Sequence, residues 1–208
     1  MNIFDLTYDI ENGMVHFKGD PIPRIKQVKS INKDGYNVKK IIIGTHTSTH
    51  VDSPSHFIEN GKSVDKVDVF SYSGIVSVID ASKYDKITPE LIKNVSNKKI
   101  FFYTGSNLEW NKYKTFKNYS YITKETAEMI VKKNVDLIGI DSPSIEEPNN
   151  KDFPAHKILL GNNVLIIENL NSIELKKLVG KVVFVLTLPL KIKEGDGSPA
   201  RVIAFELP

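Results

Sequence analysis

Three histidines and an aspartate lie close together in this chain and could bind a metal ion. The segment reads His46-Thr-Ser-Thr-His50-Val-Asp52-Ser-Pro54-Ser-His56 and holds three of the five histidines. Histidine and aspartate are poor residues for an apolar core, whereas imidazole and carboxylate are common ligands of divalent metals. A polar loop with incidental histidines is the alternative. The density of ligand-type residues favours a metal site.

The spacing of these residues limits the shape of the segment. On a flat strand, His46 and His50 would lie about 13 Å apart, too far to share one ion. On a helix the two histidines would share a face, but Asp52 would point away from it. Pro54 also forbids an ordinary helix through the motif. We therefore expect a bent ligand loop.

An apolar strand is expected just before this loop. Residues 38–43, Val-Lys-Lys-Ile-Ile-Ile, predict a buried strand that ends near Gly44. His56 would then lie at the start of the next turn. This arrangement places the ligands at the end of a strand, where α/β proteins usually keep their binding sites.

A second histidine and acid pair lies further along the chain. Asp152 and Pro154 predict the start of a short helix with His156 in its first turn, and Gly161 suits a left-handed cap at its end. Glu168 follows an apolar strand, where a carboxylate is costly unless it reaches solvent or binds something. A surface histidine and a solvated glutamate are the alternative. Together with the first motif, the pair is better interpreted as metal ligands.

The composition indicates an ordinary globular protein. The chain has 208 residues, 40% hydrophobic and 25% charged, with a net charge of +3. We expect one domain over residues 1–208. The lysines are scattered among acids, which argues against nucleic acid as a partner. No cysteine is present, which excludes disulfides and thiolate zinc sites. With no signal peptide or membrane span in the sequence, we expect a cytoplasmic protein without membrane contact.

Strand-like runs outnumber helix starts in the rest of the chain. Helix starts are predicted at Thr88, Thr123 and Asn171, where capping residues precede amphipathic segments. Some strands have no helix between them. The expected fold is therefore α/β with a mixed β-sheet or barrel-like core and a few flanking helices, not a regular doubly wound sheet. The apolar runs that predict strands are 74–79, 99–103, 136–140, 163–167, 181–186 and 201–205.

The spacing His-x3-His-x-Asp-x-Pro-x-His at 46–56, with His156 and Glu168, resembles the cyclase-like family of metal-dependent hydrolases. Bacterial kynurenine formamidase (arylformamidase) and isatin hydrolase are members. The resemblance runs along the whole chain, including 19–21, 139–144 and 188–199. It implies a swivelling β/β/α fold assembled as a homodimer or a higher homo-oligomer.

The resemblance also implies roles for individual residues. Asp52 would bridge two divalent ions per subunit, zinc first and manganese as the alternative. His56 matches the catalytic histidine of the family and is not expected to be a ligand. The sequence has Ser48 where the family usually has glycine. The implied metal ligands are His46, His50, Asp52, His156 and Glu168.

Two aromatic residues are candidates for substrate contacts. Phe17 stands where relatives often have tryptophan, and it could stack on an aryl ring. Trp110 lies in a polar stretch, where it could line the pocket or simply pack a long loop.

The residues and the family resemblance together predict a metal-dependent amidohydrolase. A metal-activated water would hydrolyse a small aryl amide, and the resemblance implies N-formyl-L-kynurenine, cleaved to L-kynurenine and formate, as the best single candidate substrate. An isatin-like lactam or another cyclic amide is the alternative substrate. A non-catalytic metal-binding or ligand-binding protein of the same fold is the alternative function. His56 distinguishes the two functions, because a structural metal site has no use for an unligated histidine beside it.

Overall fold

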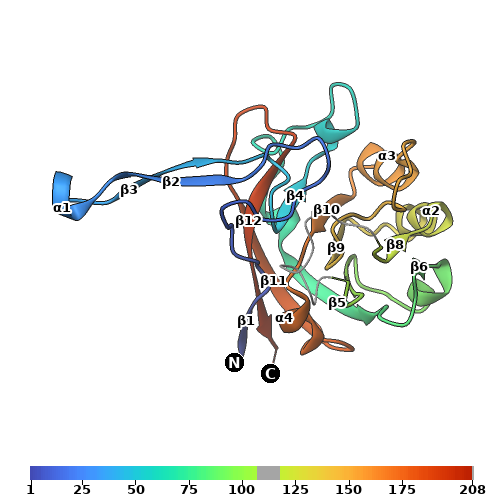
Figure 1. Cartoon of the computed structure of the whole chain (residues 1–208). Helices are drawn as coiled ribbons and strands as arrows, with labels where there is room; N and C mark the ends of the chain where they lie inside the picture. The colour runs from blue at the N-terminus through green and yellow to red at the C-terminus, as the bar shows by residue number, and fades with distance from the viewer. Residues whose placement is uncertain (107–117, 208) are drawn as a thin grey trace.

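A sheet that closes on itself forms the centre of the computed structural model, which describes residues 1–106 and 118–207 (Figure 1). The strands are β1 (Ile3–Asp5), β2 (Arg24–Lys29), β3 (Val38–Ile42), β4 (His50–Asp52), β5 (Gly74–Asp80), β6 (Lys86–Ile87), β7 (Lys99–Tyr103), β8 (Tyr121–Ile122), β9 (Leu137–Ile140), β10 (Leu165–Glu168), β11 (Val182–Pro189) and β12 (Gly197–Glu206). The helices are α1 (Ile31–Asp34), α2 (Lys124–Lys132), α3 (Pro154–Gly161) and α4 (Ser172–Lys176), with short 3₁₀ turns at Pro54–His56, Val69–Tyr72 and Pro89–Ile92.

The closed sheet combines a parallel half and an antiparallel half. Its strands follow the order β12, β11, β5, β7, β9, β10 and β4, and β4 pairs again with β12. Strands β5, β7, β9 and β10 are parallel, and the other pairings are antiparallel. β1 adds to the free edge of β12 outside the ring. The expected mixed α/β fold with a barrel-like core is confirmed, and the six predicted strand runs lie in β5, β7, β9, β10, β11 and β12.

Apolar residues on both faces of the parallel strands explain their continuous hydrophobic runs. In β7, Phe101 and Tyr103 belong to a core cluster shared by the strands of the ring. Ile100 and Phe102 belong to a second cluster, which also holds residues of α2 and α3. Parallel strands covered on both faces usually read as unbroken apolar sequence. The parallel half therefore supplies an apolar face against which α2 and α3 pack.

Helix capping agrees with the sequence at two of the three predicted starts. The Thr123 side chain accepts a hydrogen bond from the Thr126 N–H at the start of α2. Asn171 accepts bonds from the N–H groups of Ile173 and Glu174 at the start of α4. The start at Thr88 produces only a 3₁₀ turn. No helix in the described residues has the length and apolar character needed to cross a membrane.

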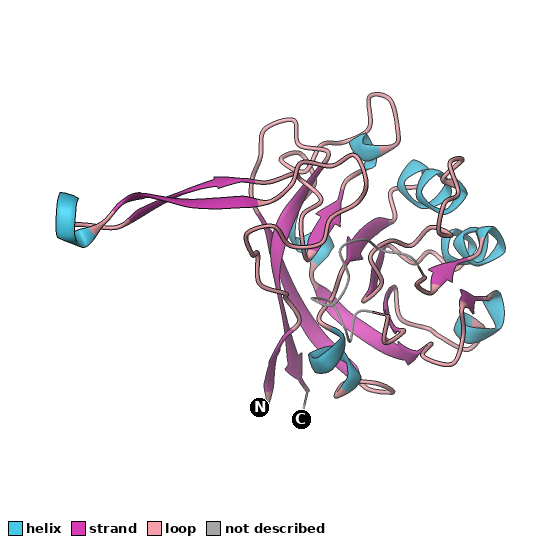
Figure 2. Ribbon diagram, in the orientation of Figure 1, coloured by secondary structure: helices cyan, strands magenta, loops and turns pink. Residues whose placement is uncertain are grey.

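The strand predicted at 38–43 exists, but the prediction that it is buried was wrong. β3 pairs only with β2, and the two strands with α1 form an arm that protrudes from the ring (Figure 2). Every residue of β3 is exposed. The arm, residues 24–42, also holds six of the 28 basic residues and one of the 25 acids. The lysines are therefore less evenly scattered than expected.

Candidate metal centre

The short strand β4 brings two ligand-type residues to one face of the sheet. His50 and Asp52 are two positions apart, so their side chains point to the same side, while Val51 points into the ring core. β4 pairs with β10 so that His50 lies opposite Glu168. One ligand atom from each of His50, Asp52 and Glu168 lies within 4.8 Å of the others. Strand register therefore assembles this group.

His50 is held in an orientation suited to metal binding. Its Nδ1 lies 2.8 Å from the backbone oxygen of Ser48, so a proton on Nδ1 is donated to that carbonyl. Its Nε2 lies 3.4 Å from Asp52 Oδ1 and 3.5 Å from Glu168 Oε2. A backbone acceptor on one imidazole nitrogen leaves the other free for a metal.

Ser48 keeps the backbone shape of this loop although glycine is usual in the family. Its φ angle is 60°, in the left-handed region that glycine adopts most easily. Its hydroxyl donates to the backbone oxygen of Tyr8 at 3.1 Å, which ties the turn to the N-terminal segment. The substitution therefore preserves the turn that positions His50.

His156 reaches the same group from the first turn of α3. Its backbone N–H donates to Glu146 Oε1 at 2.7 Å, and its Nδ1 lies 3.2 Å from the same oxygen. Its Nε2 faces Glu168 Oε1 at 3.3 Å and Asp52 Oδ2 at 3.5 Å. Like His50, His156 has one nitrogen anchored and the other directed at the carboxylates. α3 ends differently from the prediction, because Gly161 is its last residue and Asn163 has the left-handed backbone (φ 58°).

A cation fits this arrangement. Asp52 Oδ2 is buried, and no hydrogen-bond donor among the described residues reaches it. The distances of 3.3–3.5 Å from His50 and His156 Nε2 to the carboxylates exceed ordinary hydrogen bonds. Buried carboxylates are costly unless paired or bound to a metal. Nitrogen and oxygen donors without sulfur suit zinc and manganese alike.

A second group of candidate ligands shares Asp52. His46 Nδ1 lies 2.8 Å from Asp52 Oδ1, and His46, Asp52 and His56 also offer atoms within 4.8 Å of one another. The rings of His46 and His56 stack with centroids 3.9 Å apart. Asp196 Oδ2 contacts both rings, at 2.9 Å from His46 Nε2 and 3.3 Å from His56 Nδ1. The structure thus brings together all six residues singled out from the sequence as ligands or catalyst.

The carboxylates hold protons on the buried histidines. Burial opposes the charged form of His46, but hydrogen bonds to Asp196 and Asp52 outweigh it and raise its pKa to about 9. Burial likewise opposes charge on His50, yet Asp52 and Glu168 raise its pKa to about 10. For Asp52, burial is outweighed by the three histidines that face its carboxylate, and they hold its pKa well below the ordinary value. The centre therefore combines positively charged histidines with an ionised Asp52 carboxylate.

Two functional candidates were missed by sequence reasoning. Asp196 lies between two glycines in the closing loop, and only the fold brings it to His46 and His56. Glu146, buried at 3% exposure, has no signal beyond its acidic neighbour Glu147. A single acidic residue in a loop belongs to no spacing pattern in the sequence, so only its proximity to the histidines in the folded protein identifies it.

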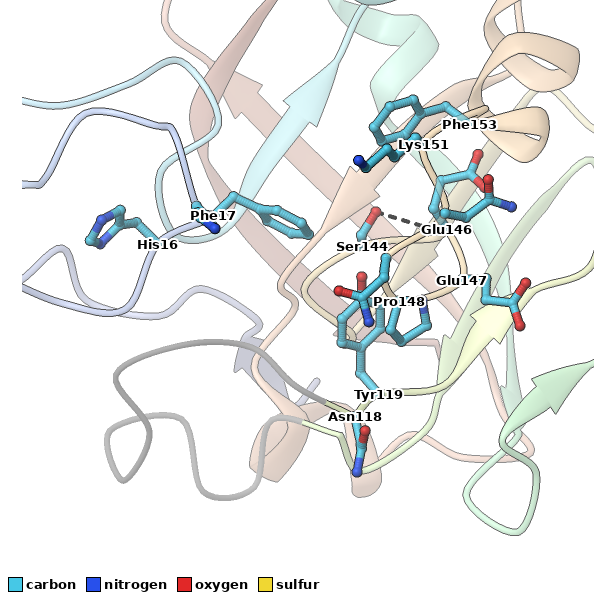
Figure 3. Close-up of a pocket in the computed structure, with 13 residues that line it drawn as sticks. His16, Phe17, Asn118, Tyr119, Ser144, Glu146, Glu147, Pro148, Lys151 and Phe153 are labelled. Carbon is cyan, nitrogen blue, oxygen red and sulfur yellow. Dashed lines mark hydrogen bonds between the residues drawn. The ribbon is translucent and has the colours of Figure 1, made fainter.

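A cavity of about 650 Å³ lies beside the centre (Figure 3). Glu146, which contacts His156, lines it together with Phe17, Tyr119 and Phe153. Burial and the nearby Glu168 and Glu146 raise the pKa of Tyr119, so its hydroxyl stays neutral. The predicted contact Phe17 is thus placed at the cavity, whereas Trp110 lies outside the described residues.

Comparisons with known proteins identify the family of this chain. Residues 4–147 match the family described as "Putative cyclase". An uncharacterised protein of Methanocaldococcus jannaschii is 36% identical over 205 residues, covering 99% of this chain and 100% of its own. A kynurenine formamidase of Bacillus cytotoxicus is 29% identical over 96% of this chain and 95% of its own.

A solved structure extends the agreement to the fold. It is described as a "Potential Metal-Dependent Hydrolase With Cyclase Activity" and superposes with a TM-score of 0.83 at 26% identity, covering 100% of this chain and 98% of its own. The resemblance inferred from the 46–56 motif is therefore confirmed. This protein belongs to the cyclase family and is a metal-dependent hydrolase.

Proposed function

We propose that this enzyme hydrolyses the carbon–nitrogen bond of a small aryl formamide, with N-formyl-L-kynurenine as the best single substrate. The observation that carries the proposal is the Asp52-centred group of ligands beside a cavity with aromatic walls. The similarity to a kynurenine formamidase supports the choice of bond. We also propose a cytoplasmic location, with which the absence of cysteine is compatible.

We propose two divalent ions per subunit, zinc before manganese. Bound there, they would supply an activated water and polarise the carbonyl oxygen. His50 and His156 would ligate through Nε2, because a backbone oxygen and Glu146 occupy their Nδ1 atoms. Asp52 would bridge, since it belongs to both ligand groups.

His56 would move the proton that the leaving amine requires. Asp196 faces its Nδ1 at 3.3 Å, which leaves Nε2 for exchange with the reacting groups. Water would add its oxygen to the formyl carbon and give one proton to His56, which would pass it to the amine nitrogen as the carbon–nitrogen bond breaks; the second water proton would be released with formate. The products are the aryl amine and formate.

A substrate panel tests this proposal. Metal-loaded protein should hydrolyse N-formyl-L-kynurenine and formanilide and leave isatin, a lactam, largely intact. Hydrolysis of isatin without hydrolysis of either formamide would instead assign the alternative lactam substrate. Inactivity toward all three compounds, in protein with full metal content, would leave the metal site standing and remove these substrates, and other small amides would be tested next.

We also propose that the protein is a homodimer in which the arm contacts the second copy. Ile31, Val38, Ile41 and Ile42 of the arm are all more than 40% exposed. A two-stranded ribbon is marginally stable alone, so these apolar side chains need a surface to cover them. Because the arm is basic, the rest of the chain carries a net negative charge. The arm of one copy is therefore complementary in charge to the remainder of a second copy.

Sedimentation of matched variants tests the assembly. Ile41→Glu places a charge on the arm at a site 57% exposed, and Ile173→Glu does so at a 56% exposed site on α4. The wild type and Ile173→Glu should be dimers, and Ile41→Glu should be a folded monomer. A monomeric wild type, or a dimeric Ile41→Glu, would contradict the arm contact.

A further inference from the structure

We propose that Glu146 is a positioning residue for His156, and that the half of the centre formed by His156 and Glu168 binds the first of the two metal ions. The inference rests on the proposed pair of ions and adds an order of filling. The two oxygens of Asp52 face different histidines: Oδ1 lies 2.8 Å from His46 Nδ1, and Oδ2 lies 3.5 Å from His156 Nε2. Asp52 therefore divides the centre into a His46 half and a His156 half.

Two neighbouring residues of one loop hold both ligands of the His156 half. The Ile145 N–H donates to Glu168 Oε1 at 2.7 Å. Glu146 Oε1 accepts from the His156 N–H at 2.7 Å and lies 3.2 Å from His156 Nδ1. These bonds fix the positions of the imidazole and the carboxylate through the protein itself.

The loop that carries Ile145 and Glu146 is itself tied down. The Ile145 carbonyl accepts from the N–H of Ile122 in β8 at 2.8 Å, and the Ile145 side chain is fully buried. The Glu146 N–H donates to Ser144 Oγ at 3.2 Å, the dashed line in Figure 3. Ligands held in place in this way lose little freedom when they bind an ion, which favours tight binding.

The charge behind the histidines also differs between the two halves. A carboxylate behind a ligating imidazole makes it a stronger ligand. Glu146 has this place behind His156, and its side chain is only 4% exposed. Asp196 has the corresponding place behind His46, but its side chain is 42% exposed. Solvent screens an exposed charge more than a buried one, so the His156 half should bind a cation more tightly.

Calorimetric titration of metal-stripped protein with zinc tests the role of Glu146. The wild type should show a tight step and a weak step. Glu146→Gln keeps an oxygen acceptor but removes the charge, so the tight step should weaken about 10–100-fold and the weak step should not change. Glu147→Gln is the matched control, because Glu147 lines the same cavity but accepts from the Tyr121 hydroxyl at 2.8 Å. An unchanged tight step in Glu146→Gln would overturn the inference.

Two further variants test the order of filling without altering Glu146. His156→Ala should lose the tight step, and His46→Ala should lose only the weak step. The opposite pattern, or binding of a single ion by the wild type, would overturn the order.

A nuclear magnetic resonance measurement separates positioning from a general structural role. In zinc-loaded wild type, the proton on His156 Nδ1 should resonate further downfield than in Glu146→Gln, because a charged acceptor forms a stronger hydrogen bond. Glu147→Gln should leave this resonance in place. An identical resonance in the wild type and in Glu146→Gln would show that Glu146 does not act on the imidazole.

These measurements use no substrate, so they are independent of the proposed function. Stepwise binding with the expected variant effects, but without hydrolysis of N-formyl-L-kynurenine, would support the inference and contradict the proposed substrate. Hydrolysis by a wild type whose tight step is insensitive to Glu146→Gln would do the reverse.

Discussion

The carboxylate of Asp196 lies 3.3 Å from Nδ1 of His56, and it joins the closing loop to the imidazole beside the metal ligands. The same oxygen lies 2.9 Å from His46 Nε2. The position of Asp196 resembles that of the acid that orients a catalytic histidine in hydrolytic triads, where the acid fixes the tautomer and stabilises the charged ring. We therefore propose that Asp196 positions His56.

Replacing Asp196 tests this relationship. Asp196→Asn keeps an oxygen acceptor for His56 but removes the negative charge, so kcat should fall about 100-fold with little change in KM. Metal content, measured by atomic absorption, should stay near that of the wild type. A fully active Asp196→Asn variant would show that His56 needs no charged partner.

His56→Ala separates a catalyst from a ligand. If His56 moves a proton, its loss should lower kcat by about 10²–10⁴-fold while most of the metal is retained. His50→Ala is the contrasting variant, since it should lose metal and activity together. A role for His56 as a metal ligand is the alternative, because its ring lies close enough to His46 and Asp52 to share an ion with them. Equal loss of metal and rate in His56→Ala would reassign His56 as a ligand.

Gly197→Ala should disturb the centre through packing alone. A Cβ at Gly197 would lie 2.6 Å from His46 Cε1 and 2.7 Å from the Val51 backbone oxygen. We expect a loss of about 1–3 kcal/mol in the free energy of unfolding, together with weaker metal binding. Thermal unfolding and metal titration measure the two effects. Gly161→Ala is the control, because the nearest atom there is 3.5 Å away; similar losses in both variants would contradict the close-packing argument.

Metal binding should release protons. The pKa values of about 9 for His46 and about 10 for His50 lie above the ordinary 6.5. Both rings are therefore protonated on both nitrogens, and positively charged, at pH 7.5 when no metal is bound. Ligation requires neutral imidazole, so metal affinity should rise from pH 7 toward pH 9–10. Calorimetry in buffers of different ionisation enthalpy counts the protons. Zero net release at pH 7.5 would contradict these pKa values.

The same shifts predict how pH affects the protein stripped of metal. A pKa raised on folding contributes stability that is fully present below about pH 6.5. That contribution should disappear as the pH rises through about 9–10. Chemical unfolding of chelator-treated protein between pH 6.5 and pH 10 measures the loss.

Local spacing identified candidate ligands that the fold brings together, and tertiary partners explain what it missed. The 46–56 motif carries its chemistry in adjacent residues, so it can be identified without a fold. The exposure of β3 could not be predicted, because Val38–Ile42 has the composition of a core strand and only its lack of sheet neighbours other than β2 exposes it. Asp196 reaches His56 only because β12 pairs with β4.

The turn residues show a similar limit. Glycine was expected to take the left-handed position after α3, but Asn163 takes it and Gly161 stays helical. Asparagine tolerates this conformation nearly as well, so composition alone does not choose between them. Ser48 likewise has a left-handed backbone, at a position where the family usually has glycine.

The most direct test of the account is a titration of metal-stripped protein with zinc, and separately with manganese. Bound ions per chain and the initial rate of N-formyl-L-kynurenine hydrolysis are measured on the same samples, with Asp52→Ala as the control. The account predicts a rate that rises with occupancy up to two ions per chain, and neither tight binding nor hydrolysis in Asp52→Ala. Full occupancy without hydrolysis, or equal hydrolysis by the stripped protein, would contradict it.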